Sequence, residues 1–260
     1  MIRQVLFTEF LKLRRSKITW LSLLAFSLVP LGGGLFMWIV REPGRAAKLG
    51  LLGTKASFVG LEATWAGYFG MLVQAVGIVG MLLLSVIAAY LFGREYSERT
   101  AKNMLALPAG RHWFALAKFC VALAWFGAII VFCLAESFAV GALLGLPGLT
   151  AGIAARGIGE VLLASGISFL VMPVTAWIAT LGKGYLPPLG FAILTLLLGT
   201  ILGATGWGKW FPWSIVPLFA GTAGPRAETL APASLVVVVL TFAVGVVATI
   251  VQYRWADNTQ

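Results

Sequence analysis

Side chains that could perform acid–base or metal chemistry are scarce in this chain. His112 is the single histidine, and Asp257, close to the end of the sequence, is the single aspartate. A His-based catalytic triad or a zinc site combines several such side chains, and no paired carboxylates interrupt the long apolar runs. The sequence therefore predicts a protein that is not an enzyme, with no catalytic residue, no metal site and no bound cofactor.

Two polar residues stand inside apolar runs. Glu136 is the one acid in such a run, and Gln74 is the strongly polar member of another. Ionisable groups at membrane depth are costly and usually line a pathway or pair with one another. We interpret both as pathway or packing residues. A Glu136 that hydrogen-bonds a neighbouring helix, or one near the outer interface, is an equal alternative, and a proton-coupled secondary transporter would use Glu136 as its proton site.

A glycine-rich stretch imitates part of a phosphate-binding loop. Residues 203–209 read GATGWGK, which matches Gly-x4-Gly-Lys, but Trp210 follows where Ser or Thr would bind magnesium. The stretch is not preceded by a sequence typical of the β-strand that comes before such a loop in soluble nucleotide-binding domains. The sequence therefore predicts that this chain lacks its own nucleotide site.

The composition is that of a membrane protein. Apolar residues make up 60% of the chain and charged residues 11%, and the mean hydropathy is +0.96. Soluble domains carry roughly 25% charged residues. The net charge of +10 does not indicate nucleic-acid binding, because the basic residues flank apolar runs and form no grooved patch.

The apolar runs predict six transmembrane helices in an all-α polytopic fold. A helix of about 20 residues crosses a hydrocarbon core about 30 Å thick. The expected spans cover about 19–40, 68–93, 114–146, 158–181, 187–206 and 233–255. Pro173 is expected to kink the fourth span.

Two further segments are expected at the membrane surface. Residues 1–17 alternate apolar and basic side chains at helical spacing, which predicts an amphipathic interfacial helix. Residues 207–232 combine four prolines with three tryptophans, which favour the lipid–water interface. We expect this second stretch to form a partly inserted external segment between spans 5 and 6.

The distribution of charge predicts the orientation. Six spans place both termini on one side, and a cytoplasmic N-terminus puts 12 Lys and Arg residues inside against 7 outside. Basic residues collect on cytoplasmic loops. Both termini are therefore expected in the cytoplasm, although four of the seven external basic residues lie in the polar segment 41–63, whose role the sequence does not indicate.

The charged stretch from Phe92 to Lys118 lies between the second and third spans. Ser97, Ala101 and Leu105 follow helical spacing, and Glu98 and Lys102 form a favourable i, i+4 pair. Pro108 ends the pattern. The stretch predicts a short amphipathic cytoplasmic helix that docks on a soluble partner; a plain solvated loop is the alternative.

Three motifs in this order resemble the type-2 permease subunits of ATP-binding-cassette exporters, in the branch of lantibiotic-immunity and bacitracin-resistance permeases. The first is the basic start, Glu9-Phe10-Leu11-Lys12-Leu13-Arg14-Arg15, and the third is Phe211-Pro212-Trp213-Ser214 before the last span. The second and most specific motif is Glu95, Tyr96, Thr100, Lys102, Leu105, Pro108, Arg111 and Lys118.

The resemblance implies a single permease domain over residues 1–260 in the bacterial cytoplasmic (inner) membrane. It implies an exporter of a hydrophobic or amphipathic compound, such as a peptide antibiotic, drug or lipid-like molecule. The partners would be two copies of a separate ATPase subunit, which carries the ATP and magnesium, and a second permease chain, identical or homologous. A membrane scaffold or sensor without transport is a further alternative. The residues that would contact the ATPase are Glu95, Tyr96, Thr100, Lys102, Leu105, Pro108 and Arg111.

Overall fold

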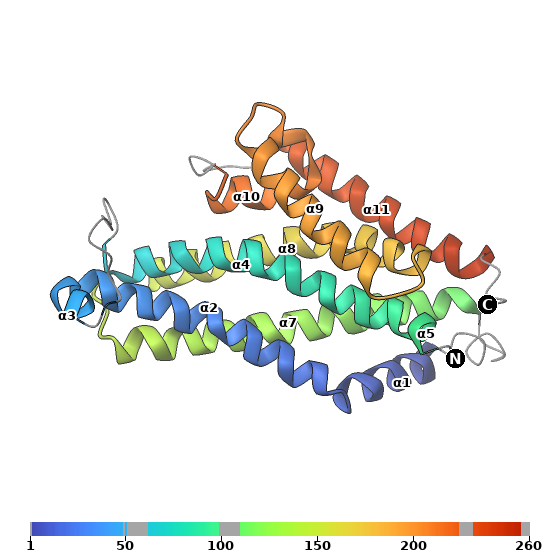
Figure 1. Ribbon diagram of the computed structural model, residues 1–260, viewed down its shortest axis with the longest axis horizontal. Coiled ribbons are helices and arrows are strands. Elements are labelled where there is room, and N and C mark those ends of the chain that lie inside the picture. The colour runs from blue at the N-terminus through green and yellow to red at the C-terminus, as the bar shows by residue number, and fades with distance from the viewer. Residues whose placement is uncertain (1, 49, 51–61, 99–109, 224–230, 256–260) are drawn as a thin grey trace.

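The fold is a bundle of long helices that run along one axis (Figure 1). The computed structural model describes residues 2–48, 50, 62–98, 110–223 and 231–255, which contain helices and no strands. Six helices among these residues are long and apolar enough to cross a membrane, which confirms the predicted all-α, six-span fold. They are α2 (Lys17–Arg41), the continuous helix of α4 (Trp65–Ala88), η1 (Ala89–Gly93) and α5 (Arg94–Ser97), then α7 (Arg111–Leu143), α8 (Ala151–Leu181), α9 (Leu186–Gly203) and α11 (Pro232–Trp255).

Hydroxyl side chains define where several of these helices begin. Ser16 accepts a hydrogen bond from the Ile18 amide at the start of α2, and Thr64 accepts one from Gly67 at the start of α4. Thr150 does the same for the Ile153 amide, at 3.2 Å, so α8 begins at Ala151 and not near residue 158 as its hydropathy suggested. The capping hydroxyl satisfies an amide that has no partner within the helix.

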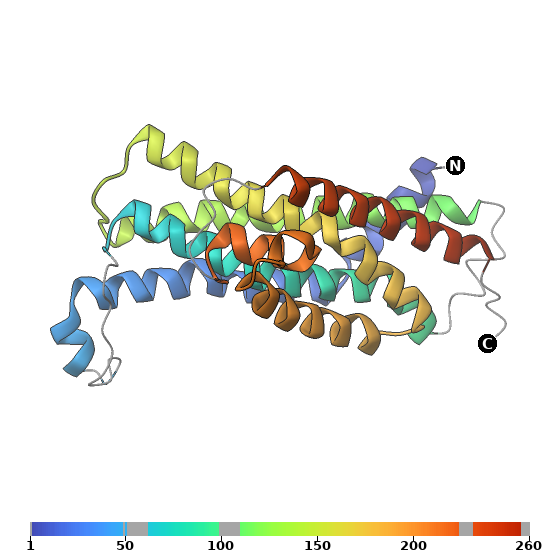
Figure 2. The same cartoon turned by 90° about the horizontal axis from the view of Figure 1, so that it is seen from above.

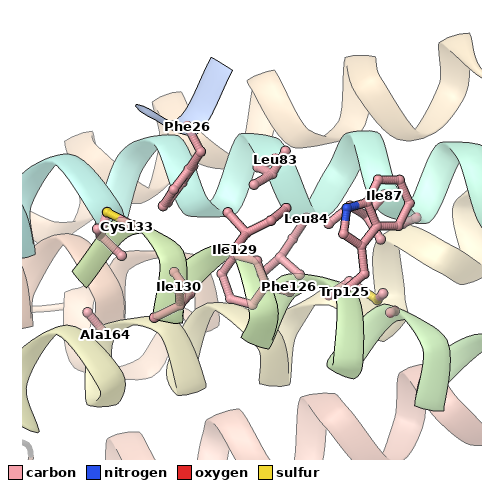
Figure 3. Close-up of a cluster of buried hydrophobic side chains, with 14 of the residues drawn as sticks. Phe26, Leu83, Leu84, Ile87, Trp125, Phe126, Ile129, Ile130, Cys133 and Ala164 are labelled. Carbon is pink, nitrogen blue, oxygen red and sulfur yellow. The ribbon is translucent and has the colours of Figure 1, made fainter. Parts of the chain in front are cut away.

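The core lies where α2, α4, α7 and α8 meet. Figure 3 shows Phe26 of α2 and Leu84 of α4 among Trp125, Phe126 and Ile129 of α7. These side chains are all at most 3% exposed, and the Trp125 indole donates to the Ser22 hydroxyl at 3.1 Å. Large apolar side chains on the outer faces of α2, α9 and α11 are exposed, as expected of helices that face lipid.

The segment between α9 and α11 folds back onto the bundle. It contains η2 (Gly208–Trp210), η3 (Pro212–Ser214) and α10 (Ile215–Ala220). Val216 of α10 is fully buried and lies against Gly77, half-way along α4, where a Cβ would come within 3.1 Å of it. The expected external segment thus packs beside the middle of a predicted span, and its depth in a membrane stays a prediction.

The two ends of the bundle differ. The start of α1 (Ile2–Arg14) and the end of α11 lie at the same end of the molecule in both views (Figures 1 and 2), together with α5 and the start of α7. We call this the terminal end. At the opposite end, α3 (Pro43–Lys48) follows α2, and Arg41 donates to the carbonyls of Leu144 and Gly145 after α7.

Candidate functional site

The candidate site is a buried group of charged side chains at the terminal end. Lys118 of α7 has a side chain that is only 2% exposed, and its ammonium donates to Glu95 Oε1 at 2.9 Å and to Glu9 Oε2 at 3.3 Å. A third hydrogen bond, of 2.5 Å, goes to the Leu91 carbonyl. An ammonium has three donors, so Lys118 is fully bonded, and each bond reaches a different helix or helix turn.

Lys12 of α1 completes the group from the solvent side. Its ammonium lies 2.6 Å from Glu9 Oε1 and 3.4 Å from Glu95 Oε1, and its side chain is 46% exposed. We call Glu9, Lys12, Glu95 and Lys118 the ionic cluster. It holds two cations and two anions, so its formal charge is zero, which is the condition under which buried charges are tolerated.

The turn of π-helix at η1 explains how Glu95 reaches the cluster. A π-turn widens the helix and shifts the register of all that follows, and such turns are frequent at functional sites. The Leu91 carbonyl lies within η1 and accepts from Lys118. Gly93 ends the turn against the α8–α9 connection, since a Cβ on Gly93 would lie 2.6 Å from the Gly184 carbonyl oxygen. Packing on both sides therefore holds the widened turn and aims Glu95 at α7.

The electrostatic setting keeps Glu9 ionised. Glu9 lies in α1, outside the membrane-spanning helices. Burial raises the pKa of its carboxyl, but the ammonium groups of Lys118 and Lys12 lower it by more, so the net pKa lies below the ordinary value of 4.5. Glu9 is therefore a carboxylate at neutral pH, paired with the ammonium groups of Lys12 and Lys118.

The end of α11 packs against the same region. The Tyr253 ring meets Phe92 of η1 edge-on at 6.4 Å, and Lys118 Nζ lies 5.9 Å above the Phe92 ring. Arg111, the first residue of α7, lies 3.5 Å from the Arg254 carbonyl. The ionic cluster and its neighbours thus join α1, α5, α7 and α11. Such a site can transmit movement among helices, and no group of three or more His, Cys, Asp or Glu able to hold a metal occurs among the described residues.

Comparison with known proteins decides the family. A model of the ABC-2 family of transporter proteins matches residues 5–199, more than half of the chain. The chain belongs to the ABC-2 transporter family. It is also similar to the bacitracin transport permease protein BCRB of Bacillus licheniformis, with 28% identity over 176 residues that cover 67% of this chain and 84% of that protein. The family match includes every member of the ionic cluster.

This ABC-2 permease brings only some of the predicted site residues together. Glu95 belongs to the ionic cluster, and Tyr96 beside it is partly buried. Arg111, the first residue of α7, is exposed and lies next to the end of α11. The other predicted docking residues lie outside the described residues; they are Thr100, Lys102, Leu105 and Pro108. The short cytoplasmic helix expected to contact the ATPase, which would run from Glu95 to Arg111 and which we call the docking segment, therefore stays a prediction beyond Ser97.

The two polar residues of the spans lie apart from the cluster. Glu136 is partly buried in the C-terminal half of α7, and its Oε2 is buried with no hydrogen-bond partner among the described residues. Gln74 of α4 is exposed on the surface of the described chain. Neither one pairs with the other residues that the sequence analysis singled out, and whether either one lines a pathway stays a prediction.

The pairing of Glu9 with Lys118 was missed from the sequence, where each residue appeared only as part of a motif. A signal for it existed. Val5, Glu9 and Leu13 share one face of α1 at i, i+4 spacing, and Val5 and Leu13 are buried against the bundle. Lys118 likewise lies in the buried stripe of α7, inside the expected third span. A charged residue at a core position of each of two helices indicates a buried ion pair.

Proposed function

We propose that this permease is the membrane-spanning subunit of an ATP-driven exporter in the bacterial cytoplasmic membrane. Its cargo would be hydrophobic or amphipathic, and similarity to a bacitracin transport permease supports a peptide antibiotic. ATP and magnesium would bind a separate ATPase subunit, present in two copies, and a second permease chain would complete the pathway. The family of transporters to which the chain belongs supports each of these partners.

The observation that carries the proposal is the ionic cluster at the start of the predicted docking segment. Glu95 stands where the continuous helix α4–η1–α5 leaves the bundle, and it is bonded to Lys118 of α7 and Lys12 of α1. A load applied to residues 95–111 by an ATPase therefore acts on three helices together. Packed elements of this kind move as rigid bodies between discrete arrangements.

The transport cycle follows from this connection. ATP binding would bring the two ATPase copies together and draw the docking segments of the two permeases toward each other. The ionic cluster would pass that movement to α1 and α7, and the pathway would change from inward-facing to outward-facing. The terminal end would face the cytoplasm, in agreement with the excess of basic residues there.

Co-purification tests the docking assignment without disturbing the ionic cluster. Lys102→Glu combined with Arg111→Glu reverses two charges in the docking segment, whereas Lys48→Glu combined with Lys209→Glu makes the same change in net charge at exposed positions outside that segment. The first pair of substitutions should reduce the ATPase recovered with the permease by about tenfold, because charge reversal at an interface adds repulsion to lost attraction. The second pair should leave recovery unchanged. Equal recovery from both variants would contradict docking at residues 95–111.

Transport itself is tested with the permease and ATPase reconstituted together in vesicles. Bacitracin should accumulate on the side opposite the ATPase when ATP and magnesium are supplied. Movement toward the ATPase side would contradict the export direction, and movement without ATP would contradict the energy source.

A further inference from the structure

We propose that the permease carries a binding site for one anionic phospholipid between α8 and α11, in the leaflet nearest the terminal end. The acyl chain would lie in an apolar groove along α11, and the phosphate would meet Arg254. This site goes beyond the proposed transport function, because lipid binding there requires neither cargo nor ATPase.

The groove is open to the surface and is lined mainly by apolar side chains. Its volume is about 520 Å³, and its walls are Trp177, Ala243, Val244, Val247, Ala248, Val251 and Gln252. Ligand pockets commonly measure about 300–1,000 Å³ and are mainly apolar with a few polar groups at one end. Here the one polar side chain in the wall is Gln252, on the last turns of α11, so the polar end faces the terminal end of the molecule.

Close packing of the two helices produces the groove. A Cβ on Gly245 would lie 2.6 Å from the Val174 nitrogen and 2.7 Å from the Pro173 carbonyl carbon, so α8 and α11 almost touch at this level. The Thr249 hydroxyl lies 3.4 Å from the Pro173 carbonyl on the same side of α11. Trp177 follows Pro173 by one turn of α8 and forms the wall of the groove that faces α11.

Arginines stand at the polar end of the groove. Val244, Val247 and Val251 follow helical spacing along α11, and the next turn of that face holds Arg254 and Trp255, both exposed. Arg111 approaches the Arg254 backbone to 3.5 Å, which places a second guanidinium in the same neighbourhood. Tryptophan favours the membrane interface, so Trp255 places this turn at headgroup level.

The charged residues near the groove favour an anionic lipid as its occupant. No acidic side chain lines the groove, and the nearby carboxylates of Glu9 and Glu95 are already bonded to Lys12 and Lys118. Arg254, one turn of α11 beyond the groove, and Arg111, which approaches the Arg254 backbone, match a phosphate above an acyl chain. Arginine binds phosphate through paired donors, and basic sites between spans bind anionic headgroups. A zwitterionic lipid such as phosphatidylcholine also carries a phosphate, but its quaternary ammonium group would add a positive charge beside these two cations.

Native mass spectrometry of the full-length permease, stripped of lipid and titrated with phosphatidylglycerol or phosphatidylcholine, tests this site. The permease should retain one phosphatidylglycerol in preference to phosphatidylcholine. Arg254→Gln should weaken phosphatidylglycerol binding about fivefold, the effect of one basic residue near a membrane surface, and Ala248→Trp should weaken binding of both lipids by filling the groove.

Matched controls separate the site from general effects. Lys209→Gln removes one exposed charge outside the terminal end, and Leu240→Trp adds an indole to an exposed position of α11 outside the groove; both should bind lipid as the unaltered protein does. Equal affinity for the two lipids, or equal losses in Lys209→Gln and Arg254→Gln, would overturn the proposal. Conversion of a dimer to a monomer by Ala248→Trp, with lipid binding unchanged, would also overturn it and identify the groove as a contact between permease chains.

Discussion

Lys118 connects several helices of the permease through hydrogen bonds. Its ammonium is buried, and all three of its hydrogens are used, on Leu91, Glu95 and Glu9. A buried charge is stable only while its partners remain in place. The residue therefore ties the position of α7 to the positions of α1 and α5.

Replacement of Lys118 by methionine should destabilise the permease severely. The methionine side chain fills the space, but it removes the buried one of the two cations between Glu9 and Glu95 and leaves only the half-exposed Lys12 to pair with both. Removal of one partner from a buried ion pair costs about 3–5 kcal/mol. Thermal unfolding in detergent, followed by tryptophan fluorescence, measures the loss. Lys209→Met, at an exposed position, should stay within about 0.5 kcal/mol of the unaltered protein.

A triple substitution separates charge from shape. Glu9→Gln and Glu95→Gln, added to Lys118→Met, remove every charge that Lys118 paired with, so much of the lost stability should return. ATPase stimulation by cargo should not return, because the charged connection between α5 and α7 is absent. A triple variant with full stability and full stimulation would show that the ionic cluster has no part in transmission.

The pKa of Glu9 predicts how stability depends on pH. Because its folded-state pKa lies below the ordinary value, the stability that Glu9 contributes is present at neutral pH and is lost as pH falls through the folded pKa. The unfolding temperature should therefore change little between pH 7 and about 5 and decrease below about 4.5. Glu9→Gln should reduce that acid-side decrease. A decrease that begins near pH 6 and persists in Glu9→Gln would assign the effect to other groups.

At the scale of elements, η1 is the joint between the second span and the docking segment. Its widened turn offers the Leu91 carbonyl to Lys118, and its last residue, Gly93, lies against the backbone of Gly184. The α8–α9 connection, η1 and α7 are thereby held together at one level. A change at this joint should affect both the stability of the bundle and its response to the ATPase.

Gly93→Ala tests the joint. The added Cβ would lie 2.6 Å from the Gly184 carbonyl oxygen and 2.9 Å from its carbon, and backbone cannot move aside as a flexible side chain can. We expect a loss of about 1–3 kcal/mol from overpacking and weaker ATPase stimulation, both measured on the purified complex. Gly70→Ala, in α4 of the same continuous helix, meets nothing within 4 Å and should be neutral or slightly stabilising. Equal effects of the two substitutions would contradict a special role for η1.

The sequence predicts those elements whose position depends on hydropathy. It does not predict those whose position depends on packing between residues far apart in the chain. The six spans can be predicted from the length of the apolar runs, because any helix that crosses the membrane needs about 20 mainly apolar residues. The start of α8 depends on one hydroxyl, that of Thr150, in a stretch that hydropathy alone does not resolve. The π-turn η1 depends on Lys118 from one side and Gly184 from the other. Residues far apart in the sequence decide it, so no local pattern could reveal it.

At the scale of the whole molecule, the buried ionic cluster and Glu136 lie in different halves of the bundle. The ionic cluster, Arg111 and Arg254 lie at the terminal end, while Glu136 stands in the C-terminal half of α7, toward the other end. An exporter driven by a docked ATPase needs its charged machinery at the end where the ATPase binds. A proton-driven carrier needs an acid within the span that exchanges protons with water through polar neighbours. The described residues agree more closely with the arrangement that an ATPase-driven exporter needs than with the one that a proton-driven carrier needs.

Glu136→Gln distinguishes these two energy sources. Glutamine keeps the shape of the side chain and its hydrogen-bonding capacity but cannot carry a proton across the membrane. Glu136 Oε2 has no hydrogen-bond partner among the described residues, and the side chain lies apart from the ionic cluster that would take part in ATP-driven movement. We therefore expect the variant, reconstituted with the ATPase, to transport cargo at a rate within about twofold of the unaltered permease when ATP is supplied, because a substitution outside the driving machinery leaves the rate-limiting step unchanged. Transport that follows an imposed pH gradient without ATP, and that Glu136→Gln abolishes, would instead make Glu136 the proton site and remove the need for an ATPase.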